Sequence, residues 1–387
     1  MKVLITGTNF LNKGAQLMMH AIVEVLRQWP EVDGIALPLE SGSFAQRRSS
    51  GVAHLLGRKV DRAPWVEGAI AQIGNVIPRR LAGMRSFIRA RDVGLVLDAS
   101  GYIYSDRSGA GPSLRARRTY RRLTRSGALV VLLPQAFGPF DDEAVRGAFR
   151  DVVATASLAY ARDPVSMQHL RAVAPGAVPL AMAPDFTLGL KGSGDREVID
   201  RHRGRACLVP NARMLRDTER ATGAWYLDVL GRVSNHLSAS GLDPYFLLHE
   251  SRDAGVADQV NARSATSIEI VRDEDPRALK GLIGSASVVV GSRYHALVSA
   301  LASGVPALGI GWTHKYAALF ADFGVTELIP ANGTPAAEIE SLLTQLADPA
   351  ERRGYEQRLR AQTAVLAETV SEMWHTIRLI AAARPRE

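Results

Sequence analysis

Short apolar runs that alternate with amphipathic stretches are the feature that most constrains the fold of this 387-residue chain. Val93–Asp98, Ala128–Pro134 and Val288–Gly291 are almost wholly apolar, as are strands buried on both faces of a parallel sheet. Helical patterns, such as those at Gly14–Trp29 and Ala224–Ser240, separate such runs. Because parallel strands need a crossover between them, usually a helix, the sequence predicts an α/β fold with doubly wound sheets.

A polar, glycine-rich segment at residues 189–196 interrupts this alternation. The chain is also longer than one ordinary domain. We therefore expect two Rossmann-like domains that bind ligand at the carboxyl ends of their strands. The predicted boundaries are an N-terminal domain at 1–188, a linker at 189–204, a C-terminal domain at 205–349 and a long C-terminal helix at 350–387. Residues 41–92 are punctuated by Arg, Gly and Pro, and we expect helices and loops there.

The composition is typical of a soluble globular protein. With 47% hydrophobic and 22% charged residues, the chain can bury large cores. The sequence has no stretch of about 18 apolar residues, so we expect no membrane span. The N-terminus is typical of a first strand and not of a signal peptide. The single cysteine, Cys207, excludes an internal disulfide, and no Cys/His cluster has zinc spacing. We expect a cytoplasmic protein without a metal.

The net charge of +8 raises the question of an acidic partner. Most of the basic residues are Arg spread along the chain, which favours a solvated surface or one that faces an acidic ligand over a nucleic-acid groove. Peripheral contact with anionic lipids at the inner membrane face stays open as an alternative. Two local clusters stand out, Arg79, Arg80, Arg85, Arg89 and Arg91, and then Arg115, Arg117, Arg118, Arg121, Arg122 and Arg125.

The segment Val288–Pro306 places a cation and a proton-transfer group at the end of a buried strand. Its apolar run leads into a helix whose first turn carries Arg293 and His295. Free N–H groups and the dipole at a helix N-terminus favour an anion. Helical residues two apart diverge by about 200°, so the two side chains converge on one ligand only if Arg293 lies in the preceding turn. Lys315 follows the next strand, where it can join Arg293 on the anion.

Polar residues also follow strands of the first half. Asn12, Lys13 and Gly14 can present an amide, a cation and a bare backbone to a polar substrate, or form a capped turn. Asp98 ends the next apolar run, either as a ligand-facing carboxylate or as a helix cap. Gln135 ends another run and is well placed for a hydroxyl-rich ligand.

The last strands of the first half end in charged residues. Arg162 can reach an anion or pair with Asp163, which we expect to cap the following helix. Asp185 follows the closing strand, where it could orient a base or a sugar hydroxyl.

With these residues assembled, the chain resembles the polysaccharide pyruvyl transferase family. The resemblance covers about residues 3 to 330, and the Arg-x-His segment is its most specific part. The motifs that carry it are Ser292-Arg-Tyr-His-Ala-Leu297 with Gly304-Val-Pro306 and the Lys315 segment, supported by Asn12-Lys-Gly-Ala15, Pro134-Gln135 with Gly138-Pro139, and Ala161-Arg-Asp163. It implies a glycosyltransferase-B-like fold, in which the long C-terminal helix packs back on the N-terminal domain.

The resemblance also implies an activity, the transfer of the pyruvyl group of phosphoenolpyruvate onto a glycan or lipid-linked sugar as a ketal. Phosphoenolpyruvate is then a substrate, and neither a cofactor nor a metal is needed. Phosphoenolpyruvate carries a carboxylate and a phosphate, and the resemblance implies that Arg293, Arg162 and Lys315 bind these two groups. His295 is the general acid/base candidate, since a histidine titrates near neutrality.

On the acceptor side, Asp185 or Asp98 would take the hydroxyl proton, and Asn12, Lys13, Gly14 and Gln135 would bind the sugar. Two alternatives stay open: a glycosyltransferase that uses a nucleotide-sugar donor, and a non-enzymatic module that binds anionic glycans.

Overall fold

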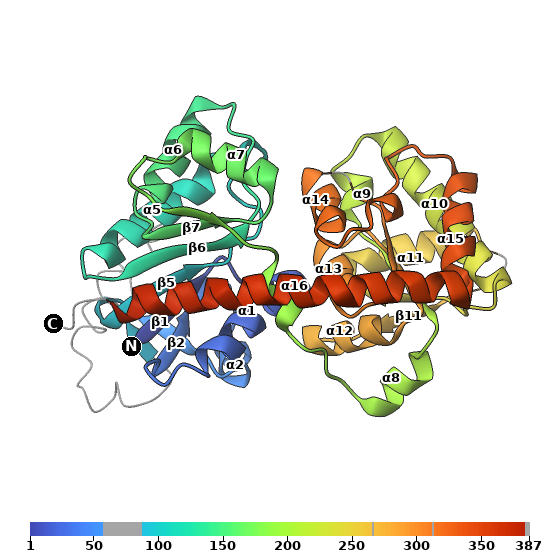
Figure 1. Ribbon diagram of the computed structural model, residues 1–387, viewed down its shortest axis with the longest axis horizontal. Helices are drawn as coiled ribbons and strands as arrows, with labels where there is room; N and C mark the ends of the chain where they lie inside the picture. Colours follow the sequence, from blue (N-terminus) through green and yellow to red (C-terminus); the bar gives the residue numbers. More distant parts are fainter. Residues whose placement is uncertain (57–86, 265–266, 312, 384–387) are drawn as a thin grey trace. The chain divides into compact units, whose positions relative to one another are not determined.

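The predicted apolar runs form parallel strands in the computed structural model, which describes residues 1–56, 87–264, 267–311 and 313–383 (Figure 1). The chain divides into two compact units, each built around one parallel sheet. Unit 1 contains Met1–Leu11, Met18–Phe186 and the chain from Val370 on, and unit 2 contains Asn12–Leu17 and Thr187–Thr369. The predicted α/β class with two doubly wound, Rossmann-like domains is confirmed.

Two segments of the chain divide differently from a simple split into an N-terminal and a C-terminal half. Asn12–Leu17 lies inside the predicted N-terminal domain, but it groups with unit 2, where Asn12 and Lys13 hydrogen-bond to Glu250 and Glu274. The long helix α16 (Pro349–Ala382) contributes its residues up to Thr369 to unit 2 and those from Val370 to unit 1. Asn12–Leu17 is connected to unit 2 by hydrogen bonds to residues more than 200 positions away. No local sequence pattern reveals such bonds.

The described part of unit 1 holds an eight-stranded sheet in the order β4-β3-β2-β1-β5-β6-β7-β8. The strands are β1 (Lys2–Thr6), β2 (Gly34–Leu37), β3 (Ala53–Leu56), β4 (Phe87–Arg89), β5 (Val93–Asp98), β6 (Leu129–Gln135), β7 (Leu158–Ala161) and β8 (Leu180–Met182). The expectation of helices and loops at 41–92 was wrong in part, because β3 and β4 lie there beside helix α2 (Phe44–Ser49). Strands of three or four residues are too short to show a period. Arg79, Arg80 and Arg85 lie outside the described residues.

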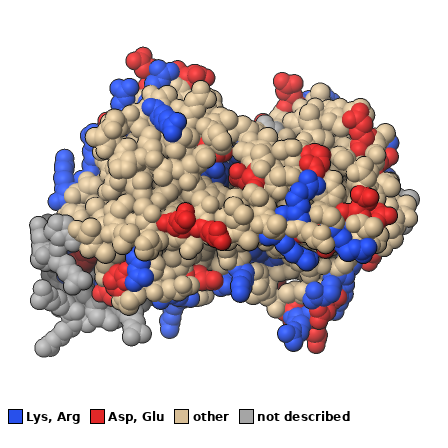
Figure 2. All heavy atoms as spheres, viewed as in Figure 1, with Lys and Arg blue, Asp and Glu red and all other residues tan. Residues whose placement is uncertain are grey.

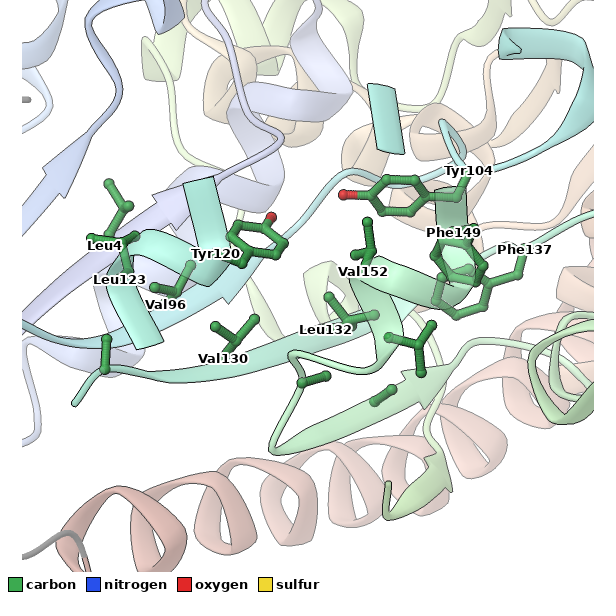
Figure 3. Close-up of a cluster of buried hydrophobic side chains, with 14 of the residues drawn as sticks. Leu4, Val96, Tyr104, Tyr120, Leu123, Val130, Leu132, Phe137, Phe149 and Val152 are labelled. Atoms are coloured by element: carbon green, nitrogen blue, oxygen red, sulfur yellow. The ribbon is translucent and has the colours of Figure 1, made fainter. Parts of the chain in front are cut away.

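Three helices pack on one face of this sheet, namely α5 (Gly111–Thr124), α6 (Glu143–Val153) and α7 (Pro164–Val173) (Figure 1). Their apolar side chains meet those of the strands in the core shown in Figure 3. At its centre the Phe149 ring lies 5.0 Å from that of Tyr104 and 5.3 Å from that of Phe137. These helices are held so that their N-termini lie at the carboxyl ends of the strands, as the crossover geometry requires.

The part of α16 that belongs to unit 1 packs on residues outside that core. Trp374 is 7% exposed, and its ring lies 6.4 Å from that of Trp29 and 5.8 Å from that of Phe186. Arg378 pairs with Glu31 at 2.7 Å, although this pair is partly exposed and contributes little. Aromatic burial therefore holds the end of α16 on unit 1.

The described part of unit 2 holds a five-stranded sheet in the order β11-β10-β9-β12-β13. Its strands are β9 (Ala206–Val209), β10 (Tyr245–Leu248), β11 (Glu269–Arg272), β12 (Val288–Gly291) and β13 (Ala307–Gly309). Its helices are α8 (Arg196–His202), α9 (Arg213–Arg216), α10 (Arg220–Ala239), α11 (Ala254–Asn261), α12 (Pro276–Ser285), α13 (Tyr294–Ala302), α14 (His314–Asp322) and α15 (Ala336–Ala347). Helix α1 (Lys13–Leu26) begins in unit 2 and continues in unit 1.

Three surface and compositional features follow from the coordinates. None of the described helices is both long and apolar enough to cross a membrane. On the face drawn in Figure 2, basic and acidic side chains are interspersed. Cys207 is fully buried in β9, and burial raises the pKa of its thiol to about 12, so it stays a neutral, inert thiol.

We predict that Trp374→Ala destabilises unit 1 by about 3–5 kcal/mol, because it removes a buried indole and leaves a cavity against Trp29 and Phe186. Urea unfolding measures the change. Leu379→Ala is the matched control, since Leu379 lies on the same helix and is 57% exposed. Equal stability of the two variants would contradict this account of how α16 is held.

Candidate functional site

The carboxyl edge of the unit 2 sheet gathers polar side chains from four strand ends and from the start of α1. The order of the strands reverses between β9 and β12, which is where open α/β sheets bind ligands. The residues there are His249 and Glu250 after β10, Glu274 after β11, Arg293 and His295 after β12, Lys315 after β13, and Asn12, Lys13 and Gly14. All of them belong to unit 2.

Arg293 lies just before helix α13, with an extended backbone at φ −99° and ψ 116°. The divergence expected of two helical residues therefore does not apply to Arg293 and His295. The guanidinium donates from Nε and Nη2 to Asp253, at 3.1 and 2.5 Å, and from Nη1 to Glu250 at 2.6 Å. Burial disfavours its charge, but the charges and hydrogen bonds of both carboxylates outweigh burial and raise the pKa of Arg293.

This pairing changes what Arg293 can do. Two carboxylates balance its charge, and Asp253 is fully buried. Of the five N–H groups of a guanidinium, these bonds use three. The main role of Arg293 is therefore to hold the strand ends together through Asp253 and Glu250. Because these carboxylates neutralise it, the net positive charge that attracts an anion must come from other basic residues of the site. The sequence pattern missed Asp253 and Glu250, although Glu250 follows a predicted strand.

His295 lies in the first turn of α13 and packs directly on Gly14 at the start of α1. A Cβ added to Gly14 would lie 2.2 Å from Nδ1 of the imidazole, so no larger residue fits without moving the ring. The ring of Tyr294 meets that of His295 edge to face at 5.4 Å. A glycine is therefore needed at position 14 to leave room for the His295 ring, which the sequence alone did not indicate.

Asn12 and Lys13 are held by unit 2 rather than pointing freely to a substrate. The Oδ1 atom of Asn12 caps α1 by accepting from Gly14 and Ala15, at 2.8 and 3.2 Å. Its amide donates to Glu250 at 3.2 Å. Lys13 is 8% exposed, and its Nζ donates to the backbone carbonyl of Glu274 at 2.6 Å and pairs with the Glu274 carboxylate at 3.0 Å. The Glu274 side chain is fully exposed, so solvent screens the ion pair and an anionic ligand can compete with that carboxylate for the ammonium.

Lys315 lies beside the start of α13, as predicted from its strand. Its Nζ lies 5.3 Å from the ring centres of both Tyr294 and Tyr316, at cation–π distance. The hydroxyl of Tyr316 donates to the carbonyl of Ser292 at 3.0 Å. These contacts hold the ammonium next to the helix that carries His295.

His249 is a site residue that the sequence pattern missed, although it ends a predicted strand as Gln135 and Asp98 do. It is 4% exposed, and its Nε2 atom is buried without a hydrogen-bond partner among the described residues. Burial, together with the charges of Arg293, His295 and Lys13, lowers the pKa of His249 to about 3. His249 is therefore neutral at physiological pH.

In unit 1 the structure joins Arg162 to Asp185. Nη1 of Arg162 donates to Asp185 at 3.1 Å, and both side chains are 3% exposed. Gln135, at the end of the neighbouring strand β6, is fully buried, and neither of its amide atoms has a hydrogen-bond partner among the described residues. Asp163 caps α7 by accepting from the backbone of Ser166 at 2.7 Å, as predicted.

Asp98 is an internal anchor and caps no helix. It is fully buried, and Oδ2 accepts from the hydroxyls of Tyr104 and Tyr120 at 2.6 and 2.7 Å. Oδ1 accepts from the backbone and hydroxyl of Ser100 at 3.0 and 2.5 Å. Burial and the Asp98 charge raise the pKa of both tyrosines well above the ordinary value. A carboxylate held by four donors in this way has no face to offer a sugar hydroxyl.

Within the described residues, no three His, Cys, Asp or Glu side chains are grouped so that they could hold a metal ion. The unit 2 site brings together cations, histidines and a helix N-terminus. Such a set can bind an anion and move a proton next to it.

We predict that His249 makes unit 2 sensitive to acid. Above its ordinary pKa of 6.5 the imidazole is neutral in both the folded and the unfolded chain, and between 6.5 and about 3 only the unfolded chain takes up the proton. Stability is therefore lost as the pH falls through this window, by about 1.4 kcal/mol per unit. In urea unfolding, the loss between pH 7 and about pH 5 should be about 2 kcal/mol smaller in His249→Leu.

His375→Leu is the control for this prediction, because His375 is exposed on α16 and should leave the pH dependence unchanged. The same acid sensitivity in wild type and in His249→Leu would show that His249 is not held neutral.

Solved structures with the same fold include enzymes of sugar nucleotides. A protein described as a UDP-N-acetylglucosamine 2-epimerase, from Listeria monocytogenes, has a TM-score of 0.62 at 14% identity and covers 97% of this chain and 95% of its own. Anabaena HepE, in complex with UDP and glucose, has a TM-score of 0.61 at 10% identity and covers 99% of each. The UDP-GlcNAc 2-epimerase from Neisseria meningitidis, bound to UDP-GlcNAc, has a TM-score of 0.53 at 12% identity and covers 96% and 100%.

These identities are low, so the likeness concerns the fold, and it confirms the predicted glycosyltransferase-B type. No curated protein matches the chain in sequence. The family model described as Polysaccharide pyruvyl transferase matches residues 12–314. That range is most of the chain, and it begins at Asn12 and includes both Arg293 and His295. The chain therefore belongs to the polysaccharide pyruvyl transferase family.

Proposed function

We propose that this protein transfers the pyruvyl group of phosphoenolpyruvate onto two hydroxyls of a glycan, forming a ketal and releasing phosphate. The observation that carries the proposal is the position of His295. It lies on the first turn of α13, at the switch point of the unit 2 sheet, in the same unit as Lys315, Lys13 and Arg293. An anion held at this edge would lie next to a group that can donate a proton.

The reaction balances without a cofactor. A proton added to the methylene carbon of phosphoenolpyruvate makes a methyl group and leaves oxocarbenium character at the neighbouring carbon. One glycan hydroxyl adds there and loses its proton, and the C–O bond to phosphate breaks. A second hydroxyl adds to the same carbon and loses its proton. One of the two hydroxyl protons replaces the proton consumed at the methylene, and the other leaves with the phosphate.

Each unit 2 residue has a role in this proposal. His295 gives the proton to the methylene carbon. Lys315, and Lys13 once the ligand displaces the Glu274 carboxylate, hold the carboxylate and the phosphate together with the N–H groups at the start of α13. Arg293 positions these groups through Glu250 and Asp253. Neutral His249 adds no further positive charge next to Arg293 and His295.

Unit 1 is the side we assign to the acceptor. Of the two predicted candidates for accepting a hydroxyl proton we keep Asp185, which is buried and paired with Arg162, and drop Asp98, because its carboxylate is fully engaged. The buried amide of Gln135 is suited to a sugar hydroxyl. The acceptor class is a polysaccharide, an oligosaccharide or a lipid-linked glycan.

The alternative function is a glycosyltransferase with a nucleotide-sugar donor. It is favoured by the fold shared with Anabaena HepE, whose structure contains UDP and glucose. Thermal stabilisation by each donor, together with an assay of phosphate release, distinguishes the two functions. Under the proposal, phosphoenolpyruvate stabilises the protein against heat, and phosphate release requires both phosphoenolpyruvate and a glycan whose mass increases by a ketal. Stabilisation by UDP-glucose, with none by phosphoenolpyruvate, would overturn the proposal.

We predict that His295→Gln lowers kcat by about 10²–10⁴-fold while the KM for phosphoenolpyruvate changes little, because the variant keeps a polar side chain but cannot donate the proton. Phosphate release measures both constants. His375→Gln is the control, since His375 is exposed on α16. A wild-type kcat in His295→Gln would remove His295 from the reaction.

We also predict that Gly14→Ala lowers kcat by about 10- to 100-fold, because the added methyl displaces the His295 ring from its position. The matched control is Gly147→Ala in α6, where an added Cβ meets nothing within 4 Å. This control should keep full activity and gain about 0.5–1 kcal/mol of stability. Full activity in Gly14→Ala would mean that the ring position does not matter.

A further inference from the structure

Unit 1 contains a cavity of about 380 Å³ that none of the proposed roles uses. It opens where β1 and β5 end side by side, and its lining includes Gly7 and Asn9 after β1 and Ser100 after β5. From β1 the sheet continues to β2, and from β5 it continues in the opposite direction to β6. The cavity therefore occupies the switch point of the unit 1 sheet, the position at which such sheets bind ligands.

The tight approach of the two strand ends is built into the sequence. Gly7 has a φ of +79°, and a Cβ added to it would lie 2.4 Å from the Ser100 hydroxyl oxygen. Only glycine fits there. Ser100 is in turn tied to the buried Asp98, which fixes the floor beside the cavity.

Helix α5 forms one wall of the cavity and divides its arginines between two faces. Arg117 and Arg121 reach Asp151 of α6, at 2.5 and 3.3 Å. Arg115, Arg118 and Arg122 line the cavity, at a spacing of three and four residues that places them in one row. Neighbours in such a row are about 5–6 Å apart, close enough for adjacent arginines to share one phosphate or diphosphate group.

The lining carries more basic than acidic side chains in the part that the structure describes, three guanidiniums and one carboxylate, that of Glu40. Like charges three and four residues apart on a helix are destabilising, and an anion bound beside them would offset that cost. Beside the arginines the wall is apolar, with Leu39 and Ile103. The site thus combines a cationic row with apolar walls, within the size range of small-ligand pockets.

We propose that this cavity binds the phosphate or diphosphate of an acceptor that is presented as a phosphate-linked sugar. Its role as an acceptor subsite rests on the proposed function, but its affinity for phosphate does not. Arginine is the side chain best matched to phosphate oxygens, since its fork makes two parallel hydrogen bonds. Three such side chains fit a multiply charged diphosphate better than the single carboxylate of an acidic sugar.

The test is calorimetric binding of inorganic pyrophosphate to the full chain, with phosphoenolpyruvate at saturation to fill unit 2. We expect the double variant Arg115→Gln/Arg122→Gln to bind about 10- to 100-fold more weakly than wild type. Arg121→Gln is the matched control on the other face of α5 and should stay within about twofold. Ala116→Phe, which fills the cavity without changing its charge, should also weaken binding.

Unchanged affinity in both the double variant and Ala116→Phe would overturn the proposal, as would pyrophosphate that binds no better than glucuronate. Two further probes distinguish the source of the phosphate: UDP-N-acetylglucosamine for a nucleotide and farnesyl diphosphate for a lipid. The one that binds more tightly than pyrophosphate identifies the carrier, and binding of neither above pyrophosphate would overturn the assignment to a linked sugar. Because these measurements need no turnover, failure of the pyruvyl transfer would leave their outcome unaffected.

Discussion

The geometry of the unit 2 site depends on one buried carboxylate, that of Asp253. Its Oδ1 atom accepts from the backbone of Ala212 after β9 and from Arg293, and its Oδ2 atom accepts from the backbone of Glu250 and again from Arg293. One side chain thereby ties together the ends of three strands. A buried charge of this kind is tolerated only when every oxygen is engaged, and loss of one partner of such a pair costs about 3–5 kcal/mol. The start of α13, and with it His295, is positioned by this network.

Unit 1 uses the same device with different partners. Asp98, at the end of β5, is surrounded by the hydroxyls of Tyr104 and Tyr120 and by Ser100, and the Tyr120 hydroxyl also lies 2.8 Å from Thr6 at the end of β1. In both units a buried acid therefore stiffens the carboxyl edge of the sheet. The ligand-facing groups, Lys315 in unit 2 and the α5 arginines in unit 1, lie around that anchor. A binding site gains accuracy when its supporting groups are fixed in this way.

Strand-end reasoning predicted where the site residues lie better than what they do. It found Arg293, His295 and Lys315 because each follows a nearly continuous apolar run, and it found Asn12–Gly14 for the same reason. It assigned Arg293 to binding the anion and did not foresee its ion pairs. The two carboxylates that neutralise Arg293 are 40 and 43 residues away, too far to appear in a local pattern. It considered Asp98 only as a ligand-facing carboxylate or a helix cap. The tyrosines that donate hydrogen bonds to Asp98 lie in later segments of the chain and were not foreseen. It missed β3 and β4, whose four and three residues are too few to show a period.

The sequence by itself determined the α/β class, the presence of two sheets and the positions at which polar groups meet their edges. These properties follow from local apolar periodicity and from the rule that parallel strands point the same way. Only the tertiary structure decided that Asn12–Leu17 belongs to unit 2, that Gly14 makes room for His295 and that the α5 arginines divide between Asp151 and a cavity. Each of these depends on contacts between distant residues, and hydrogen bonds such as that from Asn12 to Glu250, 238 residues apart, leave no trace in local pattern.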